Sequence, residues 1–109
     1  MVSYRSITDS EETVKGRIKI NLLGVFKKAY GSSIIEMEIE KNIQLNEILQ
    51  KLVDSSTDLK RVLIDPELGT PLPNAVILLN GRDISSLNGL KTSIKDGDEI
   101  ILIPVIHGG

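Results

Sequence analysis

The chain contains no cysteine, no tryptophan and a single histidine, and its aromatic residues are two tyrosines and one phenylalanine. Without cysteine it can form no disulfide, no thiolate nucleophile and no cysteine-ligated metal site. The one histidine, His107, cannot build a metal site alone. With so few aromatic rings, the hydrophobic core must be aliphatic and consist mainly of isoleucine, leucine and valine.

Neither a long hydrophobic run nor a strong net charge is present. The formal net charge is −2 over 109 residues, which leaves no footprint of nucleic-acid binding. The longest apolar run is far shorter than the roughly 20 residues that a membrane-spanning helix needs, and no signal peptide is recognised. The length predicts one domain. We therefore expect a cytoplasmic protein with no direct nucleic-acid or membrane partner.

Residues 1–15 are polar and show no sustained hydrophobic period, with several serines, threonines and acidic residues. This composition is typical of a flexible segment. We therefore divide the chain into a flexible N-terminal extension, residues 1–15, and a folded domain, residues 16–109. The extension is interpreted as a solubilising segment, with a partner-binding arm as the alternative.

Two segments in the first half of the chain show the alternation of β-strands. In residues 17–26, apolar and polar residues alternate at first, and Leu23 and Val25 then place apolar groups on the other face. Residues 35–40 alternate strictly between apolar residues and glutamates, which predicts a half-buried strand with an acidic outer face. The glutamate row is interpreted as a solvated face at the sheet edge, and a substrate or metal surface is the alternative.

A helix is predicted from apolar residues that recur at the spacing of one helical face, namely Leu45, Ile48, Leu49, Leu52 and Val53. Two starting points are open for this helix. Asn42 could cap it, or Gln44 and Glu47 could form its boundary. A second short helical turn is expected at residues 59–64, followed by a loop at residues 65–74, which are rich in proline.

Two later strands are apolar on both faces. Residues 75–79 form the first of them, and Asn80-Gly81 is a strong tight-turn signal directly after it. Residues 100–103 form the second, after the turn Asp96-Gly97-Asp98. A strand that is apolar on both faces is typical of the centre of a sheet, often in parallel pairing. Regular pairing should end about Pro104, because proline has no N–H group.

A single main helix cannot cover both faces of a sheet. The face opposite the helix should therefore present an apolar patch formed by Leu23, Ile101, Ile103, and either Ile77 or Leu79. Patches of this kind usually mark a partner surface. The alternative is that loops or a second copy of the chain cover this face.

Three segments of the second half carry a resemblance to a known family: Asn80-Gly81-Arg82-Asp83-Ile84, Leu87-Asn88-Gly89-Leu90-Lys91-Thr92 and Lys95-Asp96-Gly97-Asp98-Glu99. Together with the order of elements, they resemble the MoaD/ThiS sulfur carriers and the ubiquitin-related modifiers, archaeal MoaD-like chains in particular, over about residues 17–109. The resemblance implies an α+β, ubiquitin-like β-grasp fold. Its mixed sheet of four to five strands would pack on one main helix, with a protruding C-terminal Gly-Gly tail.

The end of the chain departs from the MoaD form of this resemblance. One proline, Pro104, remains before the ending Val105-Ile106-His107-Gly108-Gly109. The His-Gly-Gly ending is more similar to the ubiquitin-related modifiers. The pathway therefore stays open between molybdopterin synthesis, tRNA thiolation, thiamine synthesis and protein conjugation.

In the families that the chain resembles, an activating enzyme uses ATP to adenylate the C-terminal glycine, and sulfur then replaces AMP to give a thiocarboxylate. The resemblance implies this chemistry for Gly109, while Gly108 lets the backbone enter a narrow channel because glycine has no Cβ. The chain itself is expected to bind no cofactor and to be a carrier or substrate rather than an enzyme. His107 is expected to contact the channel, with a general-base role as the alternative.

By the same resemblance, Leu23, Lys27 and Ile103 fall where MoaD-type carriers contact the adenylating enzyme, and Arg82 is a further candidate. Solvated surface charge is the alternative for Lys27 and Arg82. The expected partners are the adenylating enzyme and a sulfur donor protein. A molybdopterin synthase large subunit, a tRNA thiolase or proteins conjugated on lysine would follow according to the pathway. The competing function is a β-grasp interaction module whose tail is never activated, or the small subunit of a molybdopterin synthase complex.

Overall fold

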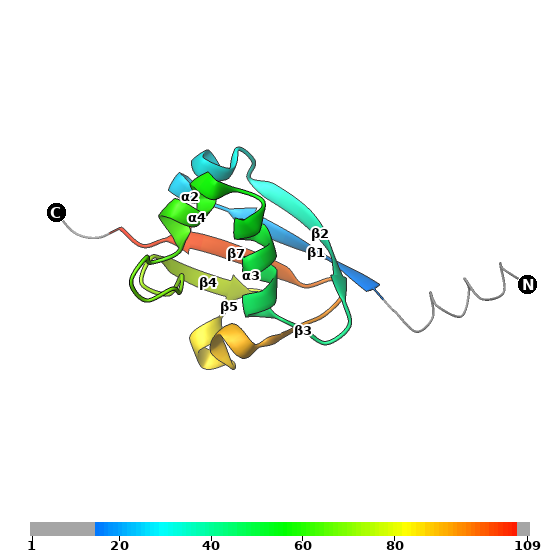
Figure 1. Cartoon of the computed structure of the whole chain (residues 1–109). Coiled ribbons are helices and arrows are strands. Elements are labelled where there is room, and N and C mark those ends of the chain that lie inside the picture. Colours follow the sequence, from blue (N-terminus) through cyan, green and yellow to red (C-terminus); the bar gives the residue numbers. More distant parts are fainter. Residues whose placement is uncertain (1–14, 107–109) are drawn as a thin grey trace, which may run out of the picture.

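The computed structural model describes residues 15–106 of the chain (Figure 1). Residues 1–14 of the predicted extension lie outside the described residues, as do His107, Gly108 and Gly109. Lys15, which the sequence places in the extension, is the first residue of the first strand.

A five-stranded sheet in the order β2-β1-β7-β4-β5 forms the body of the domain. The strand β1 pairs in parallel with β7, and every other pair of neighbours in the sheet is antiparallel. Two further short strands, β3 and β6, pair with each other. The strand bounds are β1 Lys15–Leu22, β2 Ile34–Glu40, β3 Ile43–Gln44, β4 Ala75–Leu79, β5 Arg82–Asp83, β6 Ser93–Ile94 and β7 Glu99–Pro104.

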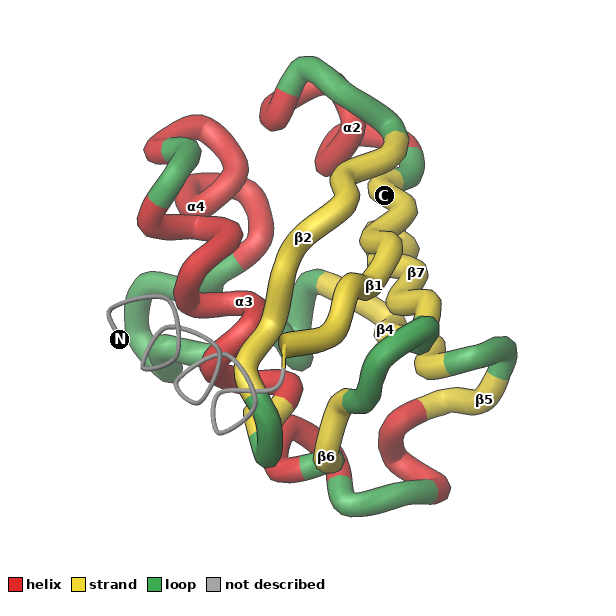
Figure 2. The backbone as a smooth tube through the Cα atoms, turned by 90° about the vertical axis from the view of Figure 1, so that its right-hand side faces the viewer, coloured by secondary structure: helices red, strands yellow, loops and turns green. Residues whose placement is uncertain are grey.

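The α-helices are α2 Gly24–Tyr30, α3 Leu45–Asp54 and α4 Thr57–Leu63, and two short 3₁₀ helices span Ile84–Ser86 and Gly89–Lys91. Helices α3 and α4 lie on one side of the sheet, called here the inner face, and α2 lies at the end of β1 (Figure 2). The domain is therefore an α+β structure in which the main helix packs across a mixed sheet, as the sequence predicts.

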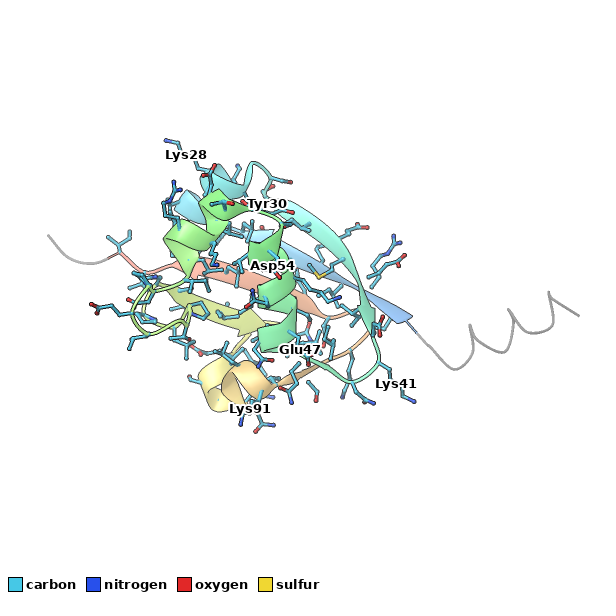
Figure 3. All side chains as sticks on the ribbon, viewed as in Figure 1. Lys28, Tyr30, Lys41, Glu47, Asp54 and Lys91 are labelled. Carbon is cyan, nitrogen blue, oxygen red and sulfur yellow. The ribbon has the colours of Figure 1, made fainter. Side chains whose placement is uncertain are left out.

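The core between the sheet and the helices is aliphatic, which confirms the expectation from composition. Its fully buried members include Ile20, Leu22, Ile48 and Ile100, and Phe26 is the one buried aromatic side chain among residues 15–106. Figure 3 shows the side chains on α3, with Glu47 and Asp54 towards its two ends. Burial of this apolar area supplies most of the stability, at about 25 cal/mol per Å² removed from water.

The main helix α3 begins at the second of its two predicted boundaries. The Glu47 carboxylate accepts a hydrogen bond from the Gln44 backbone N–H at 3.0 Å. Asn42 instead occupies a left-handed conformation with φ 64°, ahead of the short strand β3. The glutamate lies in the first turn of α3 (Figure 3), where a negative charge also interacts favourably with the helix dipole.

The predicted strand over residues 17–26 is too long, because β1 ends at Leu22. Gly24 adopts φ +54°, a conformation that side-chain-bearing residues rarely take. The chain turns there into α2, so Val25 and Phe26 belong to a helix. The alternation of apolar residues after Leu22 therefore reflects a helix start and not the far side of a strand.

The prediction that Ile77 or Leu79 lies on the outer face is wrong. Both side chains are buried in the core, whereas Val76 and Leu78 point to the other side of β4. Every residue of this strand is apolar, so its sequence cannot decide which set faces the helix. A shift of one residue in a strand exchanges its two faces.

The strand β7 is central in the sheet, as its two apolar faces predict. It lies between β1 and β4, and its pairing continues to Pro104, which is opposite Ala75. The end of regular structure at this proline is also confirmed.

Candidate functional site

The chain leaves the sheet at the end of β7 and is held there from both sides. On one side, the Leu23 N–H donates to the Leu102 carbonyl at 3.2 Å, and on the other the Val105 N–H donates to the Asn74 carbonyl at 2.9 Å. Ile106 follows with 90% of its surface exposed. The last described residues therefore leave a rigid strand and point into solvent.

Gly24 is the residue that lets α2 approach this exit. A β-carbon built at this position would lie 2.9 Å from the Pro104 ring carbon Cγ, and its φ of +54° is unfavourable for other residues. The glycine therefore combines a turn out of β1 with close packing against the end of β7. It was not among the predicted site residues, although an isolated glycine inside a strand pattern is a signal of a break or a close approach.

A continuous apolar surface surrounds the exit on the outer face of the sheet. It comprises Leu23, Val76, Leu78, Ile101 and Ile103, called here the outer patch. Ile103 lies opposite Val76, and Ile101 lies opposite Leu78. The parallel register of β1 and β7 aligns Leu22 with Leu102 and so carries Leu23 to the side of Ile103.

The exposure of the outer patch is intermediate between that of a core and that of an ordinary surface. Leu23 is 39% exposed and Val76 is 37% exposed. Because Leu22 is paired with Leu102, the predicted contact residues Leu23 and Ile103 follow paired positions on neighbouring strands. Val76 and Leu78 complete the outer patch. They were not among the predicted residues, because the sequence of a strand whose residues are all apolar does not show which of them face outward.

The two predicted basic contact residues lie at different places. Lys27 is exposed on α2, one turn after Leu23, whose carbonyl accepts from the Lys27 N–H at 3.4 Å. Arg82 belongs to β5 at the edge of the sheet, and it pairs with Leu79, at the end of β4 away from Pro104. Lys27 thus lies on α2 one turn from Leu23, whereas Arg82 lies outside the outer patch.

The neighbour of Arg82, Asp83, has a structural role at the start of a 3₁₀ helix. Its carboxylate accepts a hydrogen bond from the Ser85 backbone N–H at 2.8 Å. Hydrogen bonds from the backbone and the side chain of Ser85 hold the pKa of the Asp83 carboxyl below its usual value.

Two of the motif segments that carry the family resemblance are hydrogen-bonded to each other. The Asn80 side-chain amide donates to the Asp98 carboxylate at 2.9 Å, and its carbonyl oxygen accepts from the Glu99 N–H at 2.9 Å. The Asp98 carboxylate also accepts from the Lys95 N–H at 2.8 Å. These residues therefore fix the turn that starts β7, and the motif acts by aligning the strand that carries the tail.

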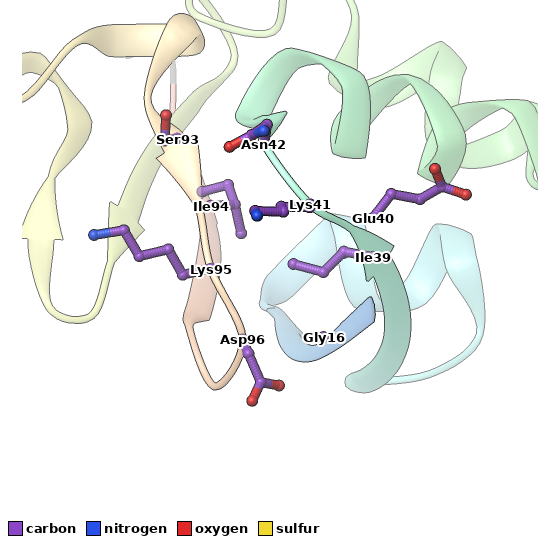
Figure 4. Close-up of a pocket in the computed structure, with 9 residues that line it drawn as sticks. All are labelled: Gly16, Ile39, Glu40, Lys41, Asn42, Ser93, Ile94, Lys95 and Asp96. Atoms are coloured by element: carbon purple, nitrogen blue, oxygen red, sulfur yellow. The ribbon is translucent and has the colours of Figure 1, made fainter. Parts of the chain in front are cut away.

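A cavity of about 380 Å³ lies at the other end of β1, beside Gly16 (Figure 4). Ile39 and Ile94 contribute apolar walls, and Lys41 and Lys95 lie on the neighbouring turns. Gly16 lies near the start of β1 and the exit follows its end, so the cavity is remote from the outer patch. Among residues 15–106 there is no cluster of three potential metal ligands, and no helix is long and apolar enough to span a membrane.

Comparison with known proteins connects this geometry to a family. The model of the ThiS family matches residues 20–109, which include the exit strand and the terminal Gly108-Gly109. The chain belongs to the ThiS family. The match confirms the resemblance proposed from the motif segments.

Two curated relatives of this family member have informative names. A protein of Archaeoglobus fulgidus described as a putative sulfur carrier protein is 32% identical over 77 residues, covering 69% of this chain and 83% of the relative. Small archaeal modifier protein 3 of Haloferax volcanii is 25% identical over 92 residues, covering 84% and 98% respectively.

Solved structures of ThiS-like proteins give the same picture. Small archaeal modifier protein 1 of Methanosarcina acetivorans superposes with a TM-score of 0.74 at 28% identity, covering 87% of this chain and 98% of that chain. A chain from a complex of subunits 1 and 2 of the molybdopterin-converting factor of Helicobacter pylori gives a TM-score of 0.53 at 25% identity, covering 85% and 99%.

These comparisons establish the class of the protein. Its relatives are small modifiers and sulfur carriers, so this ThiS family member is a ubiquitin-like carrier or modifier protein and not an enzyme. The β-grasp fold expected from the sequence is confirmed by the superposition on the archaeal modifier.

Proposed function

We propose that this ThiS family member is activated at its C-terminal glycine and carries sulfur or becomes conjugated through that residue. A partner enzyme would bring the Gly109 carboxylate to the α-phosphate of ATP. The carboxylate oxygen attacks that phosphorus, pyrophosphate leaves, and an acyl-adenylate forms. Hydrosulfide then attacks the carbonyl carbon and displaces AMP, which leaves a thiocarboxylate on Gly109.

The observation that carries the proposal is the placement of the chain exit. The central strand β7 is paired with β1 up to Leu102 and with β4 up to Pro104, and the outer patch lies around its end. A partner can therefore dock on the outer patch and receive residues that extend beyond it. Extended residues span at most about 3.3–3.6 Å each, so three residues such as His107 to Gly109 would span at most on the order of 10 Å when fully extended.

The roles of the predicted residues follow from this arrangement. Leu23 and Ile103 would anchor the activating enzyme, and Lys27 would add a cationic contact at the border of the outer patch. Gly108 and Gly109 would thread the partner's channel, with His107 as a channel contact. Arg82 lies outside the patch, so we assign it no part in this docking. The chain itself would hold no cofactor, because ATP is bound by the activating enzyme.

The names of the relatives favour a sulfur carrier or a protein modifier. By the family resemblance, the sulfur would pass to a small molecule or tRNA, or the chain would be joined to lysine side chains. A sulfur donor protein would supply the sulfur in either case. The similarity to a molybdopterin-converting factor chain favours, as a second candidate, the small subunit of a molybdopterin synthase with a large subunit as its partner. Both candidates use the same activated glycine.

Deletion of Gly109 tests the proposal, because the carboxylate would then end one residue short of the α-phosphate of ATP. The full chain should support ATP–pyrophosphate exchange with its activating enzyme, and mass spectrometry should show one carboxylate oxygen replaced by sulfur. The truncated chain should remain folded and bound but lose exchange by at least about a hundredfold, as expected when reacting atoms are misplaced. Equal exchange by both chains would instead favour an interaction module that is never activated.

A further inference from the structure

The strand β2 forms one edge of the five-stranded sheet. Its inner neighbour is β1, and no strand among residues 15–106 pairs with its other side. The strand is seven residues long, and Figure 2 shows it as the outermost strand beside β1. An open edge of this length is a template for a further strand.

The pairing with β1 determines which backbone groups of β2 face the open edge. The Leu22 N–H donates to the Ser33 carbonyl at 2.8 Å, and these two residues continue the register of the ladder. Hydrogen-bonded and non-hydrogen-bonded pairs alternate along an antiparallel ladder. Met37 therefore directs its backbone groups to β1, whereas Glu36 and Glu38 direct their N–H and C=O groups to the open edge.

The side chains of β2 divide into two rows by the same alternation. Ile35 and Met37 are partly buried against the core, and Glu36 and Glu38 are exposed on the outer face. A strand added at this edge would therefore meet acidic residues on the outer face of the sheet and aliphatic residues on its inner face.

The glutamates disfavour the pairing of β2 with a second copy of itself. In an antiparallel pair centred on Met37, Glu36 of each chain would lie opposite Glu38 of the other. Like charges directly opposite each other destabilise a strand pair. The open edge is thus protected against self-association but not against a strand of opposite charge.

The strand β1 shows which sequence β2 accepts as a neighbour. Arg17 lies opposite Glu38, and Lys19 lies opposite Glu36, with Arg17 nitrogens 3.6 Å and 3.4 Å from the carboxylates of Glu36 and Glu38. The intervening residues of β1, such as Ile18, are apolar and face the core. A sequence that alternates basic and apolar residues therefore fits one side of β2, and the same pattern complements its open side.

From this geometry we infer that the open edge of β2 binds an extended segment of a partner protein in which basic residues alternate with apolar residues. The segment adds a strand to the sheet through the backbone groups of Glu36 and Glu38. This edge is separated from the outer patch by β1, so its occupant does not compete with the activating enzyme and does not require Gly109.

The test uses an end-blocked peptide of about eight residues in which lysine alternates with valine, long enough to cover the strand. The control peptide has the same composition with lysines and valines in two separate blocks. The alternating peptide should bind, and hydrogen exchange followed by NMR should show slower exchange of the Glu36 and Glu38 amides. The Met37 amide, already paired with β1, should change little. The block peptide should not protect these amides.

Three variants of the full chain sharpen the experiment. Glu36→Lys/Glu38→Lys should weaken binding by about tenfold or more, because favourable cross-strand pairs become repulsive. Asp58→Lys/Glu67→Lys makes the same change in net charge away from β2 and should leave affinity unchanged. Glu38→Pro should remove an outward N–H donor while keeping the fold, since proline is tolerated where an edge N–H faces solvent.

Several results would overturn the inference. These are equal binding of the block peptide, no binding of the alternating peptide, protection that appears on the outer patch in place of β2, or equal weakening by both charge-reversal variants. A chain that lacks Gly109 should bind the peptide normally. Loss of activation with retained peptide binding would therefore separate this site from the proposed function.

Discussion

The outer face of the sheet consists of two halves that share one backbone architecture but differ in chemistry. On β1 and β2, the outward residues are mostly charged and form cross-strand pairs such as Arg17 with Glu38. On β7 and β4, the outward residues are mostly aliphatic, as in the pair of Ile103 with Val76. Both halves are apolar on the inner face. The difference shows that packing on the helices dictates only the inner residues, and that the outer residues remain free for a partner.

The difference between the halves is visible in the sequence pattern. In the half on β1 and β2, apolar and polar residues alternate, and the outward charged side chains are solvated or form ion pairs. The half that does not alternate exposes apolar area without cover from any element among residues 15–106. Because water makes such exposure unfavourable, the outer patch would gain stability if a partner covered it.

The largest effect on stability should come from the inner face, which the two halves share. Leu49 of α3 is 3% exposed and belongs to the same core as Ile20. Leu49→Ala should therefore lower the free energy of unfolding by about 2–5 kcal/mol. Chemical denaturation measures this loss, and a value below about 0.5 kcal/mol would contradict the assignment of the inner face.

The next largest effect should be on the affinity for the activating enzyme. This effect should differ between the two halves of the outer face. Ile103→Asp places a charge in the outer patch and should weaken binding to the activating enzyme by about 2 kcal/mol or more, roughly thirtyfold. The matched control is Ile34→Asp on β2, an isoleucine that is 50% exposed. It should leave affinity unchanged. Calorimetry on folded variants measures both, and equal losses would show that the halves do not differ in function.

A smaller effect is expected in the charged half. Arg17→Ala removes both contacts to Glu36 and Glu38, whose side chains are about as exposed as that of Arg17. Exposed ion pairs contribute little, so the free energy of unfolding should fall by less than about 1 kcal/mol. The loss should shrink further at high salt. A loss as large as that of Leu49→Ala would mean that the charged half is a structural element in its own right.

The smallest effect should come from the chain that precedes the sheet. Its polar composition predicts that it buries little apolar surface on folding, and β1 begins only at Lys15. Deletion of residues 1–14 should therefore shift the melting temperature by less than about 2 °C. Differential scanning calorimetry on both chains measures the shift. A large drop would show that the extension packs on the body and that one half of the outer face is covered in the full chain.

Much of the fold was predictable because several segments carry unambiguous periodicity. The helix stripe that contains Leu49, the strict alternation of residues 35–40 and the doubly apolar last strand each have one physical solution. The boundary at Gly24 was missed, because Leu23 and Val25 continue the alternation of a strand while the glycine conformation starts a helix. The orientation of β4 could not be predicted, since both of its faces are apolar.

The candidate site was predictable in part for the same reason. Leu23, Ile103 and Lys27 were named from the family resemblance, and the structure places them around one exit. The structure also adds Val76 and Leu78 and moves Arg82 away from the exit. The predictions on His107, Gly108 and Gly109 fall outside the described residues, and their chemistry is the subject of the proposal on activation.

The sequence by itself determined the aliphatic core, the central position of β7, the end of pairing at Pro104 and the family, because these depend on residue type and local order. Only the tertiary structure decided which apolar residues remain outside. Strand register and the turn at Gly24 set the neighbours of Ile103, and pairing of β2 with β1 alone leaves the Glu36 and Glu38 backbone open. These outcomes depend on contacts between residues far apart in the chain, which no local pattern records.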